Sequence, residues 1–279
     1  MLVTSKRQIN EEMGISREVV KTADYLIDTL KNKTKNGLPF NMRTVCGVKN
    51  QRFCRFAYGT NLFNGAINRV VFDVYVFDFD KVKYFADSGI FNDGGEYSPQ
   101  NKTLNVKLYG FMNKTGDSVK AYYFDGTYEI LNHELMHAYE FSKGKRNPGK
   151  FYDYSGYMDN NSPDYVRAMS YSAYYFSKIE ISAHASELFA ELKTKAPKSV
   201  EEARSTNTYQ SFLEEVNKAK SAMNIISKDD DMQAKIGEMF NSTYNAVRRY
   251  INYGIKLCRK KLERVIKLYC VRFGNLNYY

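Results

Sequence analysis

The amino-acid sequence predicts an α+β protein in which a small mixed or antiparallel sheet packs on one long helix and the C-terminal half is mostly helical. Three observations predict this class. Residues 69–78 and 103–109 alternate apolar and polar side chains and are rich in β-branched and aromatic residues, as strands are. Residues 125–143 carry apolar side chains at mostly helical spacing. Most of the chain after residue 163 shows helical spacing as well.

The N-terminal part is expected to begin with a helix over residues 7–33, which has one apolar side and is closed by Asn36-Gly37. A turn-rich stretch at 88–101 precedes the last strand of the sheet. That strand alternates cleanly, so we expect one of its faces to be exposed. The predicted strands are 52–58, 69–78 and 103–109.

The helix at 125–143 has start and stop signals at both ends. Asp125 and Thr127 can cap its beginning, and Glu129 suits the positive end of the helix dipole. Gly144, directly after Lys143, suits the end of the helix.

This helix carries the motif His133-Glu134-Leu135-Met136-His137, which is HExxH and uses two of the three histidines in the chain. Helix positions four apart lie on the same side one turn apart, so both imidazoles can share one metal ion. A catalytic zinc takes three protein ligands and leaves a position for water, whose pKa falls toward ~7. Glu134 flanks the metal without binding it, and it can act as the general base. The motif therefore predicts peptide-bond hydrolysis through a zinc-activated water.

A third zinc ligand has to come from elsewhere in the chain. The extended motif HExxHxxGxxH would need Gly at 140 and His at 143, but the chain has Glu140 and Lys143. Glu180 lies in a second helical stretch, followed by the small Ala183, which would let that helix pack closely on the first. We therefore choose Glu180 as the third ligand.

The segments HELMHAYE at 133–140 and EISAHASELFA at 180–190 together resemble the gluzincin-type zinc metallopeptidases, in which HExxH is followed by a downstream ExxA(D/N). The resemblance covers about a quarter of the chain. It implies a zincin-like fold with a zinc cofactor, and it implies that the strand at 103–109 is the edge strand that pairs with an extended substrate. It also implies that the ligands are His133, His137 and Glu180, with Glu134 as base.

His184 departs from the family pattern, because Asp or Asn often stands at this position. Its imidazole can orient a ligand, stabilise the tetrahedral oxyanion, or replace Glu180 as ligand, since the two residues are four apart. We favour the orienting role. We expect Glu187, one turn further on, to be a solvated helix residue, and Glu140 to be either a hydrogen-bond acceptor beside the site or simply exposed.

The predicted organisation has three parts: an N-terminal helix at 1–40, a zincin-like catalytic core at 41–195, and a helical C-terminal subdomain at 196–279. A long surface loop is expected at 144–163. The C-terminal helices are predicted at 200–226, 232–252 and 255–273.

The last predicted helix is basic and amphipathic. In the last 37 residues nine basic side chains stand against Glu263 alone, a net charge of +8. The charge suggests docking onto an acidic partner, nucleic acid or an anionic surface. The alternative, which we favour on the sequence alone, is a helix that covers the core with a solvated basic side. The basic residues are Arg248, Arg249, Lys256, Arg259, Lys260, Lys261, Arg264, Lys267 and Arg272, and the apolar ones are Leu257, Leu262, Val265, Ile266, Tyr269 and Phe273.

Composition sets limits on the class of protein. At 279 residues, 43% hydrophobic and 26% charged, the chain can bury a large core, which argues against disorder. The cysteines form no CxxC pair, so we expect reduced thiols. Without an apolar run for a signal peptide or a membrane span, we expect a cytoplasmic or virion-associated protein. The cysteines are Cys46, Cys54, Cys258 and Cys270.

The sequence thus predicts a zinc metallopeptidase that acts on a protein or peptide. Two alternatives stay open. One is a structural or virion-associated protein whose zinc site is not catalytic. The other is a nucleic-acid-associated module that uses the basic C-terminal helix.

Overall fold

The computed structural model describes the chain from residue 15 to 273 with gaps, and it divides into two compact units, Ser16–Gly144 and Lys145 onward together with Ile15. Each unit is considered by itself. The described residues are 15–34, 41–45, 48–78, 94–112, 121–122, 124–145 and 161–273.

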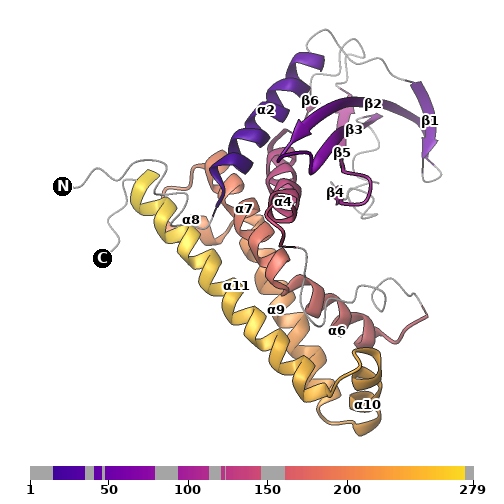
Figure 1. Ribbon diagram of the computed structural model, residues 1–279, viewed down its shortest axis with the longest axis vertical. Helices are drawn as coiled ribbons and strands as arrows, with labels where there is room; N and C mark the ends of the chain where they lie inside the picture. Colours follow the sequence, from indigo (N-terminus) through magenta and orange to yellow (C-terminus); the bar gives the residue numbers. More distant parts are fainter. Residues whose placement is uncertain are drawn as a thin grey trace. The chain divides into compact units, whose positions relative to one another are not determined.

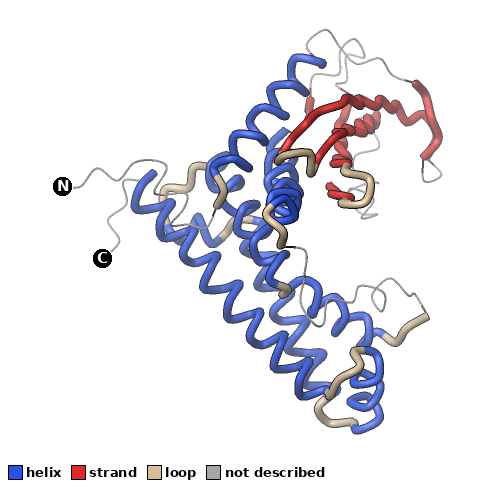
Figure 2. The backbone as a smooth tube through the Cα atoms, viewed as in Figure 1, coloured by secondary structure: helices blue, strands red, loops and turns tan. Residues whose placement is uncertain are grey.

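The first unit is built on a mixed sheet of six described strands, drawn red in Figure 2. The strand order is β1-β2-β3-β5-β4, with β6 also pairing with β5. The β3–β5 pair is parallel, and the other pairs are antiparallel. The strands are β1 (Asn41–Val45), β2 (Val48–Leu62), β3 (Ile67–Asp78), β4 (Gly94–Ser98), β5 (Thr103–Met112) and β6 (Ala121–Tyr122).

The long hairpin of β2 and β3 is held by its register and its turn. Arg55 and Asp73 lie opposite each other in the ladder, and the Arg55 Nε atom is 2.6 Å from the Asp73 Oδ1 atom. Such opposite charges on facing strand positions stabilise the pair. The connection uses three residues with positive φ, Phe63, Asn64 and Gly65, which turn the chain back over a short distance.

Two helices are described in the first unit. Helix α2 (Arg17–Thr34) packs on α4 (Phe124–Ser142), and α4 packs in turn on β4 and β5 (Figure 1). Buried apolar residues of the strands and of the two helices form the core of the unit. Its fully buried side chains include Leu26, Leu30, Val70, Leu104, Val106, Leu131 and Leu135.

Several predicted elements of this unit are confirmed and two details are wrong. Helix α4 runs one residue earlier than predicted at both ends, and Gly144 takes a φ of 77°, as a C-terminal glycine should. The stretch 88–101 contains a strand, β4, and β5 lies between β3 and β4. The predicted edge position of 103–109 is therefore wrong, because β4 occupies that edge in the described sheet. Residues 7–14 of the predicted first helix and the side chain of Asp125 lie outside the described set.

The described secondary-structure elements of the second unit are all helices. Helix α11 packs along α7 and also contacts α6, α8, α9 and α10 (Figure 1). The helices are α6 (Asp164–Tyr175), α7 (Lys178–Lys195), α8 (Val200–Arg204), α9 (Asn207–Ile226), α10 (Asp230–Met239) and α11 (Tyr244–Phe273).

Helix α11 is continuous, so the predicted break near residues 253–254 is wrong. Gly254 does not end a helix; it lets α11 pack against the end of α6. A Cβ atom there would lie 2.3 Å from the Phe176 carbonyl oxygen, a contact that real side chains do not make. The glycine is therefore a packing residue rather than a helix breaker.

The α+β class, the mixed sheet and the mostly helical C-terminal half are confirmed. The partition at residues 40 and 195 stays a prediction. Cys54, Cys258 and Cys270 are buried free thiols, while Cys46 lies outside the described residues. Within the described part of the chain, no helix has the length and apolar character needed to cross a membrane.

Candidate metal centre

The two motif histidines lie side by side on α4. The ring centroids of His133 and His137 are 4.9 Å apart with an interplanar angle of 73°, and both residues are half-buried. The buried residues Leu131, Leu135 and Ala138 on the same helix fix it in the core of the unit. The helical spacing thus places two imidazoles where they can bind one metal ion, as the sequence predicts.

Glu134, between the two histidines in sequence, is held by strand β4. The backbone N–H of Tyr97 donates a hydrogen bond of 2.8 Å to the Glu134 Oε2 atom. A bond from a backbone N–H to a carboxylate is charge-assisted, so it orients the side chain strongly. One carboxylate oxygen of Glu134, Oε2, is therefore fixed by the strand, and the other, Oε1, can take part in chemistry.

Gly95 lets β4 come this close to α4. A Cβ atom at Gly95 would lie 2.5 Å from the Glu134 Cγ atom and 2.7 Å from the Ile130 Cγ2 atom. Any other residue would push the strand and helix apart. The lack of a side chain at Gly95 therefore helps to position Glu134, the candidate base.

Tyr97 is anchored by its own side chain. Its hydroxyl donates to the Ala66 carbonyl oxygen at 3.1 Å, and its ring meets Phe141 edge-on at 6.0 Å. The residue is only 9% exposed. The donor that holds Glu134 is therefore fixed to both the sheet and α4. Sequence reasoning missed Gly95 and Tyr97, because Gly94-Gly95-Glu96-Tyr97-Ser98 has the composition of a turn.

The second set of predicted residues lies on α7, in the second unit. Glu180 is in the first turn of this helix, where its backbone N–H donates to the Ser177 Oγ atom at 3.4 Å. Glu180 is 2% exposed, and Ala183, one turn on, is fully buried. Buried carboxylates are stable where hydrogen bonds, opposite charges or a metal ion compensate them.

His184 is held on two sides within the second unit. Its ring stacks on Tyr175, with centroids 4.1 Å apart and an interplanar angle of 31°. Its Nδ1 atom lies 3.5 Å from the Glu187 Oε2 atom. Burial raises the pKa of Tyr175, so this tyrosine stays neutral as a stacking partner. The His184 ring therefore has a fixed plane and a nearby carboxylate.

Three other carboxylates near the predicted residues have distinct settings. The Glu187 side chain is 29% exposed and also lies 3.5 Å from the Thr208 Oγ1 atom, so it is not the freely solvated residue expected. Glu140 is buried, which rules out the exposed alternative. Glu191 caps α9: its oxygens accept from the backbone N–H groups of Asn207 at 2.7 Å and Thr208 at 2.9 Å.

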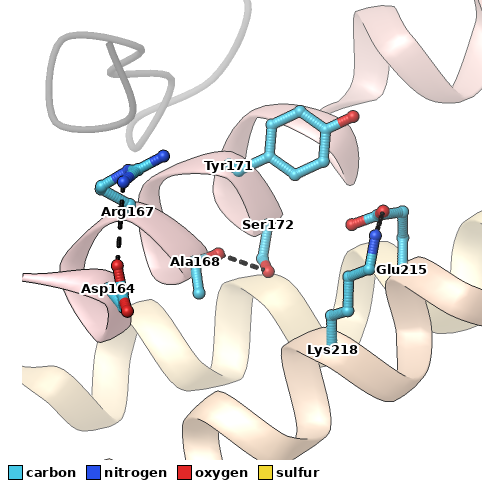
Figure 3. Close-up of a pocket in the computed structure, with 7 residues that line it drawn as sticks. All are labelled: Asp164, Arg167, Ala168, Tyr171, Ser172, Glu215 and Lys218. Atoms are coloured by element: carbon cyan, nitrogen blue, oxygen red, sulfur yellow. Dashed lines mark hydrogen bonds and ion pairs between the residues drawn. The ribbon is translucent and has the colours of Figure 1, made fainter. Parts of the chain in front are cut away.

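A separate pocket of about 340 Å³ lies between α6 and α9 (Figure 3). Its charges are paired locally: Arg167 lies 3.7 Å from Asp164, and Lys218 lies 2.6 Å from Glu215. It contains none of the predicted site residues, and its balanced charges give no reason to expect a nucleophile or base there. The lining residues are Asp164, Arg167, Ala168, Tyr171, Ser172, Glu215 and Lys218.

Comparison of the chain with protein-family models, with curated proteins and with solved structures finds no match.

Proposed function

We propose that this chain is a zinc-dependent metallopeptidase in which His133, His137 and Glu180 bind zinc and Glu134 is the general base. One observation carries the proposal: two imidazoles lie side by side on α4, and the carboxylate between them in sequence is held by a backbone N–H of β4. Structural histidines on an amphipathic helix do not require such a tethered carboxylate.

The donor types fit zinc. Two imidazole nitrogens and one carboxylate oxygen are a usual ligand set for catalytic zinc, and His133, His137 and Glu180 could hold a metal ion. His133, His184 and Glu187 form a second set that could do so. His133 and His137 belong to the first unit, and Glu180, His184 and Glu187 belong to the second.

We favour Glu180 over His184 as the third ligand. The His184 Nδ1 atom lies beside the Glu187 carboxylate and its ring stacks on Tyr175, which suits a residue that orients a ligand. Glu180 is buried, and its carboxylate is a donor type that zinc accepts. Glu180 is also the position that the resemblance to gluzincins implies.

The chemistry follows from the two oxygens of Glu134. Bound zinc would lower the pKa of a water molecule and polarise the substrate carbonyl. Because Tyr97 engages Oε2, the Oε1 atom of Glu134 is the one that would take the proton of the attacking water. The same carboxyl group would then deliver the proton to the leaving amine nitrogen, and the Tyr97 bond would keep it in place.

The substrate would bind as an extended strand beside β4. Strand β4 pairs with β5 along one side, and the Tyr97 N–H points away from β5 toward Glu134. Backbone groups two residues apart point the same way in a strand, so Gly95 presents its N–H and C=O along that outer edge. An extended peptide paired there would lie next to the base.

Metal analysis combined with a cleavage screen tests this function. We expect one zinc per chain, lost in the His133→Ala His137→Ala variant, and peptide cleavage that requires Glu134. Stoichiometric zinc without any Glu134-dependent cleavage would favour the alternative of a non-catalytic zinc site in a structural or virion-associated protein. Absence of stoichiometric zinc in the wild-type chain would contradict both.

A further inference from the structure

Helix α11 carries exposed basic side chains along much of its length, and we call this surface the basic face. It is formed by seven exposed side chains, Arg248, Arg249, Lys256, Arg259, Lys260, Arg264 and Lys267. We propose that the basic face binds the phosphate backbone of nucleic acid. This inference goes beyond the peptidase proposal and does not depend on it.

The other side of α11 is already occupied by its own unit. Leu262, Val265 and Ile266 are fully buried, and α11 packs along α7. Lys261 belongs to this inner side, where its Nζ atom donates to the Ser182 Oγ atom at 2.9 Å. The apolar side is therefore not available for insertion into a membrane surface, which an interfacial amphipathic helix requires.

On α11 itself, the described residues include a single acidic side chain beside the basic face. Between residues 244 and 271 the helix has eight basic residues and one acidic residue, Glu263. Arg204 binds Glu263 through two hydrogen bonds, of 3.2 and 2.8 Å, and Tyr209 donates to it as well. The charge of Arg259, on the basic face, also lowers the pKa of Glu263. Among the described residues, no carboxylate forms an ion pair with the seven cations of the basic face.

The excess of positive charge on the basic face distinguishes between two interpretations of α11, a surface that binds an anionic partner and a helix face that is only solvated. A helix face that is only solvated usually mixes both signs, because i,i+4 pairs of opposite charge stabilise it and like charges repel. The basic face keeps like charges together, which costs stability in the unbound protein. An anionic partner would offset that cost.

The dimensions of the basic face fit a regular linear polyanion. Arg248 and Lys267 are nineteen positions apart, which is about 28 Å along a helix, and the seven side chains fall within an arc of roughly 160°. Duplex DNA carries one negative charge per ~1.7 Å of its axis, so several phosphates fall within this length. Four of the seven residues are arginines, whose planar guanidinium groups match phosphate oxygens.

The sparse apolar surface argues against an acidic protein as the partner. Protein interfaces depend on buried aromatic or aliphatic anchors. Among the described residues of α11, only Tyr253 and Val271 are large hydrophobic side chains with high exposure, 59% and 46%. Tyr253 lies between the arginines and lysines, where its ring can pack against a sugar or base.

The test uses the full chain carrying Glu134→Gln and a fluorescent mixed-sequence DNA duplex of about 20 base pairs, followed by anisotropy over a salt series. We expect binding at low salt that weakens steeply as salt rises. The variant Lys256→Gln Lys260→Gln Lys267→Gln should bind at least about tenfold more weakly and lower the log–log salt slope by about 3.

The matched control is Lys220→Gln Lys228→Gln Lys235→Gln, which removes the same charge from exposed positions outside α11. It should bind as the parent does, and thermal unfolding should show that both triple variants fold. No binding at low salt, or equal losses in both variants, would overturn the proposal. Equal or tighter binding of polyglutamate, or of phosphatidylserine vesicles, through the same three lysines would overturn nucleic acid as the partner.

Discussion

The backbone N–H of Tyr97 donates a hydrogen bond of 2.8 Å to the Oε2 atom of Glu134, and this bond ties strand β4 to the centre of the HExxH helix. The residues around this bond fix the position of its donor. The hydroxyl of Tyr97 is bound to the Ala66 carbonyl oxygen, so the donor cannot drift away from the carboxylate without breaking a second bond. Glu134 is therefore pre-oriented in the unit, as a catalytic group needs to be.

Glu134→Gln should separate metal binding from cleavage. The amide oxygen of glutamine can still accept from the Tyr97 N–H, but it cannot take a proton from water. We expect zinc content to stay unchanged and the cleavage rate to fall by about 10²-fold or more. The measurement pairs metal analysis with a peptide cleavage assay. The control Glu18→Gln changes an exposed carboxylate in the same unit and should leave both quantities unchanged. If the Glu134→Gln variant cleaved peptide at the wild-type rate, Glu134 would not be the base.

Gly95→Ala should disturb the contact between β4 and α4. The new methyl group would lie 2.5 Å from the Glu134 Cγ atom, so the helix and strand have to move apart. We expect the free energy of unfolding to drop by about 1–3 kcal/mol, measured by urea denaturation. Gly59→Ala is the matched control, because it also lies in a strand of this sheet and its Cβ would meet nothing closer than the Asn68 carbonyl oxygen at 4.0 Å. Equal losses in the two variants would show that the close approach at Gly95 is not the cause.

Glu180→Gln and His184→Asn should differ in their effect on zinc affinity. If Glu180 is a ligand and His184 orients one, the first change should weaken zinc binding by more than about 100-fold and the second by about 10- to 100-fold. Competition with a chromophoric chelator measures both. The backbone bond from Glu180 to Ser177 survives the substitution, so the start of α7 should stay intact. The reverse order of losses would make His184 the third ligand.

The parts that sequence reasoning predicted are those that depend on local pattern. Helix α4 has an apolar periodicity and a terminal Gly144, and its motif histidines depend only on helical spacing. Strands β3 and β5 were predicted because side chains alternate over residues 69–78 and 103–109. Each of these features can be seen within one short window of sequence.

The parts that it missed depend on contacts between distant segments. Strand β4 is five residues long and begins with two glycines, and it forms because β5 pairs with it and α4 packs on it. Gly254 has the local signature of a break, yet its role is set by Phe176, far away in sequence. The capping of α9 by Glu191 likewise joins two helices. No local window of sequence contains these partners.

The ion pair at Glu263 should make the stability of the second unit depend on pH in the acid range. Burial alone would raise the pKa of Glu263, but hydrogen bonds from Arg204 and Tyr209 outweigh burial and lower it. A carboxylate with a lowered pKa in the folded state contributes stability above its unfolded value of ~4.3, and that contribution is lost as the pH falls through the folded pKa. Because Arg204 is 46% exposed, we expect a contribution of no more than about 1 kcal/mol.

Comparing the stability of wild type and Glu263→Gln at several pH values tests the predicted loss of stability in acid. At neutral pH the variant should unfold at a lower urea concentration than wild type, and the difference should shrink as the solution is taken to about pH 3. Glu201→Gln, an exposed carboxylate on α8, should show no such trend. A difference between wild type and Glu263→Gln that is constant from neutral to acid pH would mean that packing of the side chain, rather than its charge, stabilises the contact between α8, α9 and α11.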